Sequence, residues 1–208
     1  MKTLDSIDLL EAASDWLGLW FPKGSPSPSR LEKLIVCSNA QRMPKTHAFA
    51  ILAPVPQVHL LSGLEAIAAQ LDSDVLPSDH LPKVAFGSMD FEGFGEVEKL
   101  RGGKAVEVLI YASHAKGEQP LNPQVTWRGL YTGYVGSRRG RYPGQSIYRP
   151  KSTATDTPTW AVFWEVQELE PLKQPIPIGS LRGKNKKTNY PARFIPEGPV
   201  LIEYPAMG

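Results

Sequence analysis

Three long β-type segments restrict the fold of this chain more than any other feature of its sequence. They cover residues 104–113, 124–135 and 158–169, and each is rich in β-branched and aromatic side chains, which are enriched in strands. The 208-residue chain also contains 20 prolines and 18 glycines. Because these residues favour turns and interrupt helices, the sequence excludes an all-helical protein and predicts a β-rich core.

Shorter signals complete an α+β pattern. Residues 47–53 predict a strand that the two following prolines should end. Ser62 and Glu65 have the spacing of a capping box, which predicts a helix of about ten residues from Ser62 onward. Residues 84–94 predict a strand interrupted by glycines. The last two predicted elements are an extended proline-rich edge segment at residues 170–179 and a strand at residues 200–204.

The N-terminal part of the chain differs from the rest. Apolar residues recur at helical spacing between Asp5 and Leu19, and residues 23–29 form a Pro/Ser-rich linker. We therefore predict a helical extension with its linker over residues 1–44 and one folded domain over residues 45–208. The aromatic residues that follow the helix either dock it on the core or form a surface for a protein partner; they are Trp16, Trp20 and Phe21.

Positive charge is concentrated in the second half of the chain. Residues 1–100 carry 8 Lys and Arg against 13 Asp and Glu, whereas residues 101–193 carry 15 against 6, a net charge of +9. This asymmetry indicates an anionic partner, with nucleic acid as the first candidate.

Other bounds on function are broad. Cys37 is the single cysteine, which excludes an internal disulfide and suits a reducing compartment. No apolar run reaches the length of about 18 residues that spans a bilayer, and the N-terminus does not read as a signal peptide. The sequence thus predicts a cytoplasmic protein without a membrane partner and without a cofactor.

Catalytic motifs are missing from the sequence. It contains neither a Gly-x-Ser-x-Gly elbow nor a phosphate-binding Gly-x4-Gly-Lys-Ser/Thr loop, and its four histidines lack metal-ligand spacing. The acidic residues Asp90, Glu92, Glu96 and Glu107 could hold Mg²⁺ in a nuclease, although a solvated strand face explains them as well. We predict no catalytic residue and no metal site, and a binding protein is favoured over an enzyme.

Two basic clusters are candidates for phosphate binding, because Arg and Lys bind phosphate and neighbouring aromatic faces stack on unpaired bases. The alternative is a solvated charged loop. The candidate phosphate-binding residues of the first cluster are Arg138, Arg139, Arg141, Arg149 and Lys151. Those of the second cluster, which runs from Arg182 to Arg193, are Lys184, Lys186 and Lys187.

The order of several segments resembles the PUA-like superfamily, nearest its EVE, YTH and ASCH domains. The segments are residues 103–113, 128–135, 148–150, 158–166 and 170–176. The resemblance implies a PUA-like β pseudobarrel with peripheral helices and a pocket that accepts a modified or flipped base. Family pocket roles carry over to Tyr111 and Ser113. The chain departs from the pattern at Lys104, at Ala112, and in a longer arginine-rich insertion.

Taken together, these features predict a module that binds DNA or RNA. Its basic loops would hold phosphates at the rim of a hollow formed by the aromatic strands. The ligand pocket would contain Tyr111, Ser113, His114, Trp127 and Trp160, of which the tryptophans could instead belong to the core. The alternatives are a metal-dependent nuclease on the same fold and a protein-interaction module.

Overall fold

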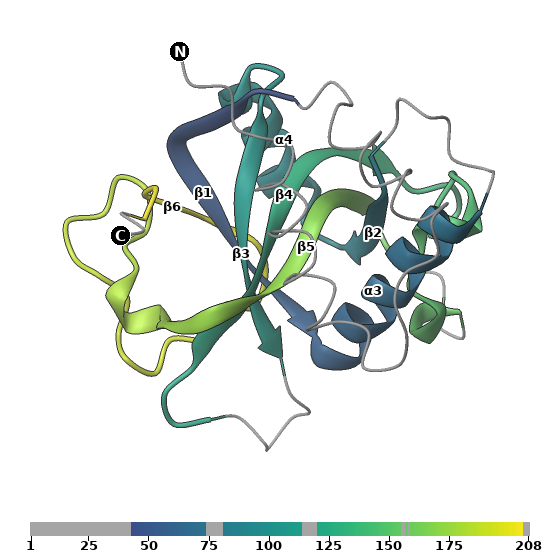
Figure 1. The fold of residues 1–208 in the computed structure, drawn as a ribbon. Helices are drawn as coiled ribbons and strands as arrows, with labels where there is room; N and C mark the ends of the chain where they lie inside the picture. The colour runs from purple at the N-terminus through teal and green to yellow at the C-terminus, as the bar shows by residue number, and fades with distance from the viewer. Residues whose placement is uncertain (1–42, 74–80, 114–119, 155–156, 158, 206–208) are drawn as a thin grey trace, which may run out of the picture.

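A computed structural model describes residues 43–73, 81–113, 120–154, 157 and 159–205. The predicted N-terminal helix and linker lie outside these residues, as does His114. The described part is α+β and contains a mixed six-stranded sheet with two α-helices (Figure 1). None of its helices is long and apolar enough to cross a bilayer.

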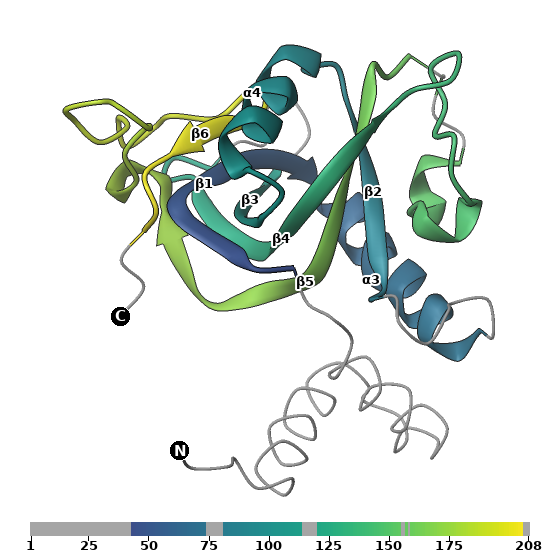
Figure 2. The ribbon, with the colours of Figure 1, turned by 90° about the horizontal axis from the view of Figure 1, so that it is seen from above.

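The sheet has the strand order β2-β5-β4-β3-β1-β6. Strands β1 and β3 are parallel, and the other neighbours are antiparallel. Figure 2 shows the central strands bending around a common interior, with β2 and β6 at the two edges. The strands are β1 (Lys45–Pro56), β2 (Lys83–Ser88), β3 (Ala105–Ser113), β4 (Gln124–Gly136), β5 (Val162–Pro177) and β6 (Val200–Ile202).

The three predicted β segments form β3, β4 and β5. Successive side chains of β3 pack into two separate hydrophobic clusters. Val108 and Ile110 belong to the larger cluster, which fills the interior of the curled sheet. Leu109 and Tyr111 belong to the smaller cluster on the other face. Because successive side chains of a strand point to opposite faces, β3 is buried on both sides, and it positions its neighbours β1 and β4.

The structure corrects the predicted start of the first helix. Helix α3 (Gln57–Asp72) begins directly after Pro56, so Ser62 lies inside the helix and the capping-box prediction is wrong. The buried Ser62 hydroxyl instead accepts a hydrogen bond from the Ser152 backbone N–H at 3.1 Å. Strand β1 also continues past Pro54 and ends only at the second proline, Pro56, because it pairs with β3 up to that residue.

The predicted strand over residues 84–94 is correct up to Ser88 and wrong beyond it. Strand β2 ends at Ser88, and helix α4 (Phe91–Arg101) follows. The Asp90 carboxylate accepts a hydrogen bond from the Gly93 N–H at 2.7 Å, and this N-cap starts the helix. Helix α4 closes one end of the curled sheet (Figure 2) and buries Phe94 and Val97 in the larger core.

Candidate ligand-binding site

The pocket predicted around Tyr111 and Trp127 is not formed. Tyr111 is 2% exposed and Trp127 is 5% exposed, and they lie in different core clusters. Neither ring can stack on a base without unpacking the core, so their assignment to a ligand pocket is wrong. Ser113 is half-buried at the end of β3, and nothing in the structure joins it to the pocket described next.

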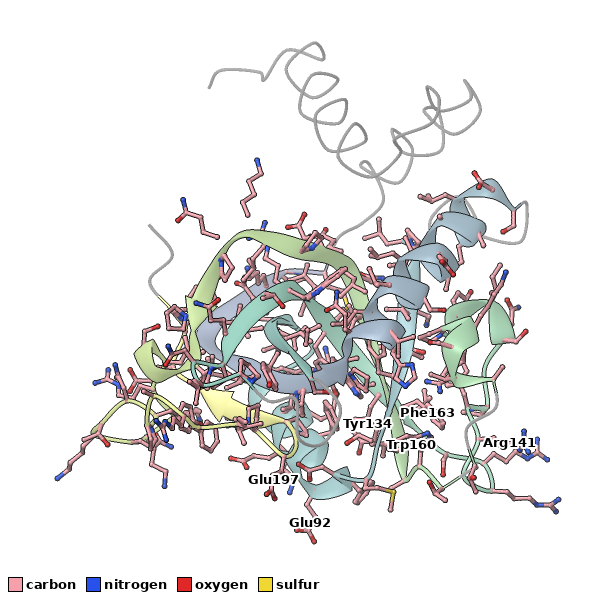
Figure 3. The ribbon with its side chains drawn as sticks, turned by 90° about the horizontal axis from the view of Figure 1, so that it is seen from below. Glu92, Tyr134, Arg141, Trp160, Phe163 and Glu197 are labelled. Atoms are coloured by element: carbon pink, nitrogen blue, oxygen red, sulfur yellow. The ribbon has the colours of Figure 1, made fainter. Side chains whose placement is uncertain are left out.

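Trp160, in contrast, lines a pocket of about 500 Å³ at the β2 edge of the sheet. The segment 137–154, here called the pocket loop, forms most of its wall, and α3 contributes Ala66 and Ala69. Figure 3 shows Trp160 beside Phe163, with Arg141 further out. The aromatic side chains of the lining are Tyr142, Trp160 and Phe163, and the cationic ones are Arg141, Arg149 and Lys151.

The indole of Trp160 lies directly on the backbone of β2. A β-carbon added to Gly87 would come within 2.6 Å of the five-membered ring, so only glycine permits this contact. The Trp160 Nε1 atom is buried and has no hydrogen-bond partner in the described part of the chain. An unsatisfied buried donor costs about 1–3 kcal/mol, so packing on Gly87 holds the ring in a conformation that polar contacts do not stabilise.

Replacing Gly87 with alanine should displace the Trp160 indole, because the new methyl group would overlap the ring. We expect a destabilisation of about 1–3 kcal/mol, as for overpacked core positions. Chemical denaturation followed by tryptophan fluorescence would measure it. The matched control is Gly136→Ala, since a β-carbon there meets no atom within 4 Å; equal stabilities of the two variants would contradict the predicted contact.

Hydrogen bonds to Glu165 fix the Tyr142 side chain of the pocket lining. The Tyr142 hydroxyl donates to Glu165 Oε1 at 2.7 Å, and Lys83 Nζ donates to Glu165 Oε2 at 2.6 Å. Burial, reinforced by the Glu165 carboxylate, raises the pKa of the Tyr142 hydroxyl, which therefore stays protonated as a donor. The Tyr142 ring meets Phe163 edge to face at 5.3 Å, so both rings are held in place before any ligand binds.

Two side chains bind the outer edge of β2 and attach the pocket loop to it. The Gln70 amide is fully buried, donates to the carbonyls of Lys83 and Ile147, and accepts from the Lys83 N–H. Arg149 donates to the Ala85 carbonyl and to Thr153 Oγ1 and lies over the Phe163 ring. Arg149 therefore positions the loop, a role that the sequence did not predict when it indicated Arg149 as a phosphate ligand.

Helix α3 holds the far end of the pocket loop through Ser152. The Ser152 N–H donates to Ser62, and the Ser152 hydroxyl is 2.9 Å from Nδ1 of His59. Together with the bond from Gln70 to Ile147, these contacts join the helix to the second half of the pocket loop. The pocket is thus a preformed cavity between the edge strand β2, helix α3 and the pocket loop, which is anchored to both.

An arginine-bearing turn forms the outer rim of the pocket. Arg138 and Arg141 exchange two backbone hydrogen bonds of 2.8 and 3.1 Å, and φ is +55° at Arg139 and +76° at Gly140. These are the features of a tight two-residue β-hairpin turn of type I′. The turn, here called the arginine hairpin (residues 138–141), presents three exposed guanidinium groups on a rigid support.

The charges of the arginine hairpin are not neutralised within the described part of the chain. None of its three arginines forms an ion pair there, whereas Arg101, Arg128 and Arg182 pair with Glu98, Glu170 and Glu203. Lys151 also lines the pocket. It is exposed and forms no ion pair with a residue that the structure describes. The pocket mouth is therefore electropositive, and its interior is largely apolar.

The second basic cluster does not reach this pocket. Residues 182–193 lie next to β6, at the other edge of the sheet. The pocket loop and this segment are on opposite sides of the protein in both Figure 1 and Figure 2. The predicted arrangement, in which both clusters line one hollow, is therefore wrong for Lys184, Lys186 and Lys187.

Two of the four acidic residues considered for a nuclease, Asp90 and Glu107, have structural contacts. Asp90 caps α4, and the buried Glu107 carboxylate pairs with Lys45 Nζ at 2.5 Å and accepts from the Tyr204 hydroxyl at 2.6 Å. The two residues lie in unconnected parts of the fold. Within the described ranges, no group of three or more His, Cys, Asp and Glu side chains could hold a metal ion.

Sequence reasoning found Trp160 and the rim cations but missed Phe163, Gln70 and Gly87. The alternation of β5 places Phe163 on the face opposite Trp164, which the sequence could have shown. Nothing in the sequence shows that Gln70 binds an edge strand.

The chain matches no protein-family model, and no curated protein matches it in sequence.

Proposed function

We propose that the protein binds nucleic acid and takes one unstacked base into the pocket at the β2 edge. The observation that carries this proposal is the composition of the pocket, in which the half-exposed rings of Tyr142 and Trp160 lie beneath a rim of cations, with the buried Phe163 as a fixed support. Base–aromatic stacking contributes about 1–3 kcal/mol per base. Arginine and lysine bind the phosphates that adjoin the base.

The dimensions of the pocket fit this assignment. Small-molecule pockets have volumes of about 300–1,000 Å³, so a cavity of about 500 Å³ accommodates a base with its sugar. Arg141 and Lys151 come from different turns of the pocket loop and both line the cavity. They can therefore contact phosphates on the two sides of the bound nucleotide, which favours a polynucleotide over a free nucleotide.

The proposal also includes the fold family. A curled mixed sheet with parallel β1 and β3, covered by helices at its edge and end, is compatible with a PUA-like pseudobarrel. The order of sequence segments that resembles EVE, YTH and ASCH domains supports the same assignment. The site nevertheless differs from the predicted one, because the pocket loop, which includes the arginine-rich insertion, supplies most of the lining and the strand end at Ser113 does not contribute to it.

A fluorescence anisotropy titration would test the function directly. Single- and double-stranded DNA and RNA oligonucleotides would each be titrated at two salt concentrations. We expect at least one of them to bind with an affinity that falls as salt rises, because phosphate contacts release counterions. Absence of salt-sensitive binding to all four would refute nucleic-acid binding.

Alanine at Arg138, Arg139 and Arg141 should weaken this binding for every sequence and flatten its salt dependence. Loss of three phosphate contacts should reduce the slope of log K against log salt by about 2 for a single strand. The control has the same loss of charge at exposed lysines outside the pocket, namely Lys99, Lys104 and Lys173. Unchanged affinity of the arginine variant at low salt would show that the hairpin does not contact the ligand.

A further inference from the structure

The basic segment beside β6 remains without a role once the pocket is assigned to the β2 edge. This segment, residues 182–193, is here called the β6-edge loop. It carries five Lys and Arg side chains and no Asp or Glu. Its position at the opposite edge of the sheet means that a ligand in the pocket does not extend to it without going around the protein (Figure 1).

The β6-edge loop is an ordered structure attached to the sheet. Lys184 N–H donates to the Leu201 carbonyl, and Glu203 N–H donates to the Arg182 carbonyl, each at 2.9 Å. The chain then returns through a hydrogen bond from Tyr190 N–H to the Leu181 carbonyl. Tyr190 stacks on Phe194 with ring centroids 4.2 Å apart. The loop thus presents its side chains from a fixed backbone.

Three of the exposed cations of the loop have no acidic partner among the described residues. Lys186, Lys187 and Arg193 are exposed and form no ion pair with a residue that the structure describes, whereas Arg182 pairs with Glu203. Lys184 lies over the Phe49 ring and lines a second hollow of about 300 Å³, together with Asn185 and Glu96. Like charges held together at one edge, without neutralisation, form a surface complementary to a polyanion.

We propose that the β6-edge loop binds the phosphate backbone of a second nucleic-acid segment, so that one protein molecule bridges two segments. This inference rests on the proposed function for the first segment only. The contacts at the loop are to phosphate and carry no base recognition, because Tyr190 and Phe194 stack on each other. The pocket would therefore select the nucleotide, and the loop would hold any neighbouring strand.

A two-colour assay would test the bridge. Two oligonucleotides of about 12 nucleotides, within the usual size of single-strand sites, carry a fluorescence donor and an acceptor. Wild-type protein should bring them together and produce energy transfer. Alanine at Lys186, Lys187 and Arg193 should abolish the transfer and leave binding of a single oligonucleotide within about threefold, since log K depends on the phosphates still contacted. The Lys99, Lys104 and Lys173 variant should retain it.

The outcomes separate the two proposals. Energy transfer that survives the change at Lys186, Lys187 and Arg193 would overturn the bridge, because two copies of the protein joined elsewhere would then explain it. Competition by polyglutamate as strong as by oligonucleotide would also overturn it and assign the loop to an acidic protein. If Trp160→Ala leaves single-oligonucleotide binding unchanged and the loop variant abolishes it, the pocket proposal fails and the loop remains a nucleic-acid site.

Discussion

Alanine in place of Trp160 should weaken oligonucleotide binding by about 10- to 100-fold, the largest functional effect that we expect from a single change. Stacking on an aromatic side chain contributes about 1–3 kcal/mol, and 1.4 kcal/mol corresponds to a factor of ten. Trp160 is half-exposed and lies on Gly87 at one wall of the pocket. Its loss should therefore remove a ligand contact without opening the main core.

Titration of a labelled oligonucleotide at constant salt would measure this effect. The control Trp160→Phe keeps an aromatic face and should retain most of the affinity. The salt dependence of the alanine variant should match that of the wild type, because the rim cations are unchanged. Equal affinities of the alanine variant and the wild type would contradict base stacking in this pocket.

Leucine in place of Gln70 should destabilise the fold by about 3 kcal/mol. The side chain is fully buried, and its amide bonds the Lys83 N–H and the carbonyls of Lys83, Ile147 and Ala66. Leucine has a similar volume but leaves the Lys83 and Ile147 groups unpaired, and each buried unsatisfied group costs about 1–3 kcal/mol. The midpoint of thermal unfolding should fall by about 10 °C.

Urea denaturation would measure the change in stability, and Gln145→Leu provides the control. Gln145 is exposed on the same pocket loop, so its replacement should change the free energy of unfolding by less than about 0.5 kcal/mol. Similar stabilities of the two leucine variants would show that Gln70 does not hold the loop to β2.

The faces of the aromatic residues show where sequence reasoning was limited. Period-two alternation along β4 predicts that Trp127 and Tyr131 share one face, and both belong to the larger core. The same alternation predicts Tyr134 on the other face, yet it packs against that core too. The register between β4 and β5 shifts between Tyr131 and Gly133, and one extra residue in a strand reverses the direction of the following side chains.

The sequence predicted the chemical type of the candidate site but only some of the residues that form it. The arginine-rich stretch beside aromatic residues indicated a cationic and aromatic site, and Arg141, Lys151 and Trp160 do line one pocket. The sequence could not show that Trp127 is sealed in the core while Trp160 is accessible, because both follow similar local patterns. Their exposure depends on the elements packed against them.

The sequence by itself determined the β-rich core, the three long strands and the concentration of positive charge in two loops. Each of these depends on residues close together in the chain, through side-chain alternation, turn chemistry and simple charge. Only the tertiary structure decided that the two basic loops lie at opposite edges, because strand order depends on pairing between distant segments. The pocket was likewise decided by tertiary contacts, since Gln70, Gly87 and Trp160 meet only when helix, edge strand and loop are packed together.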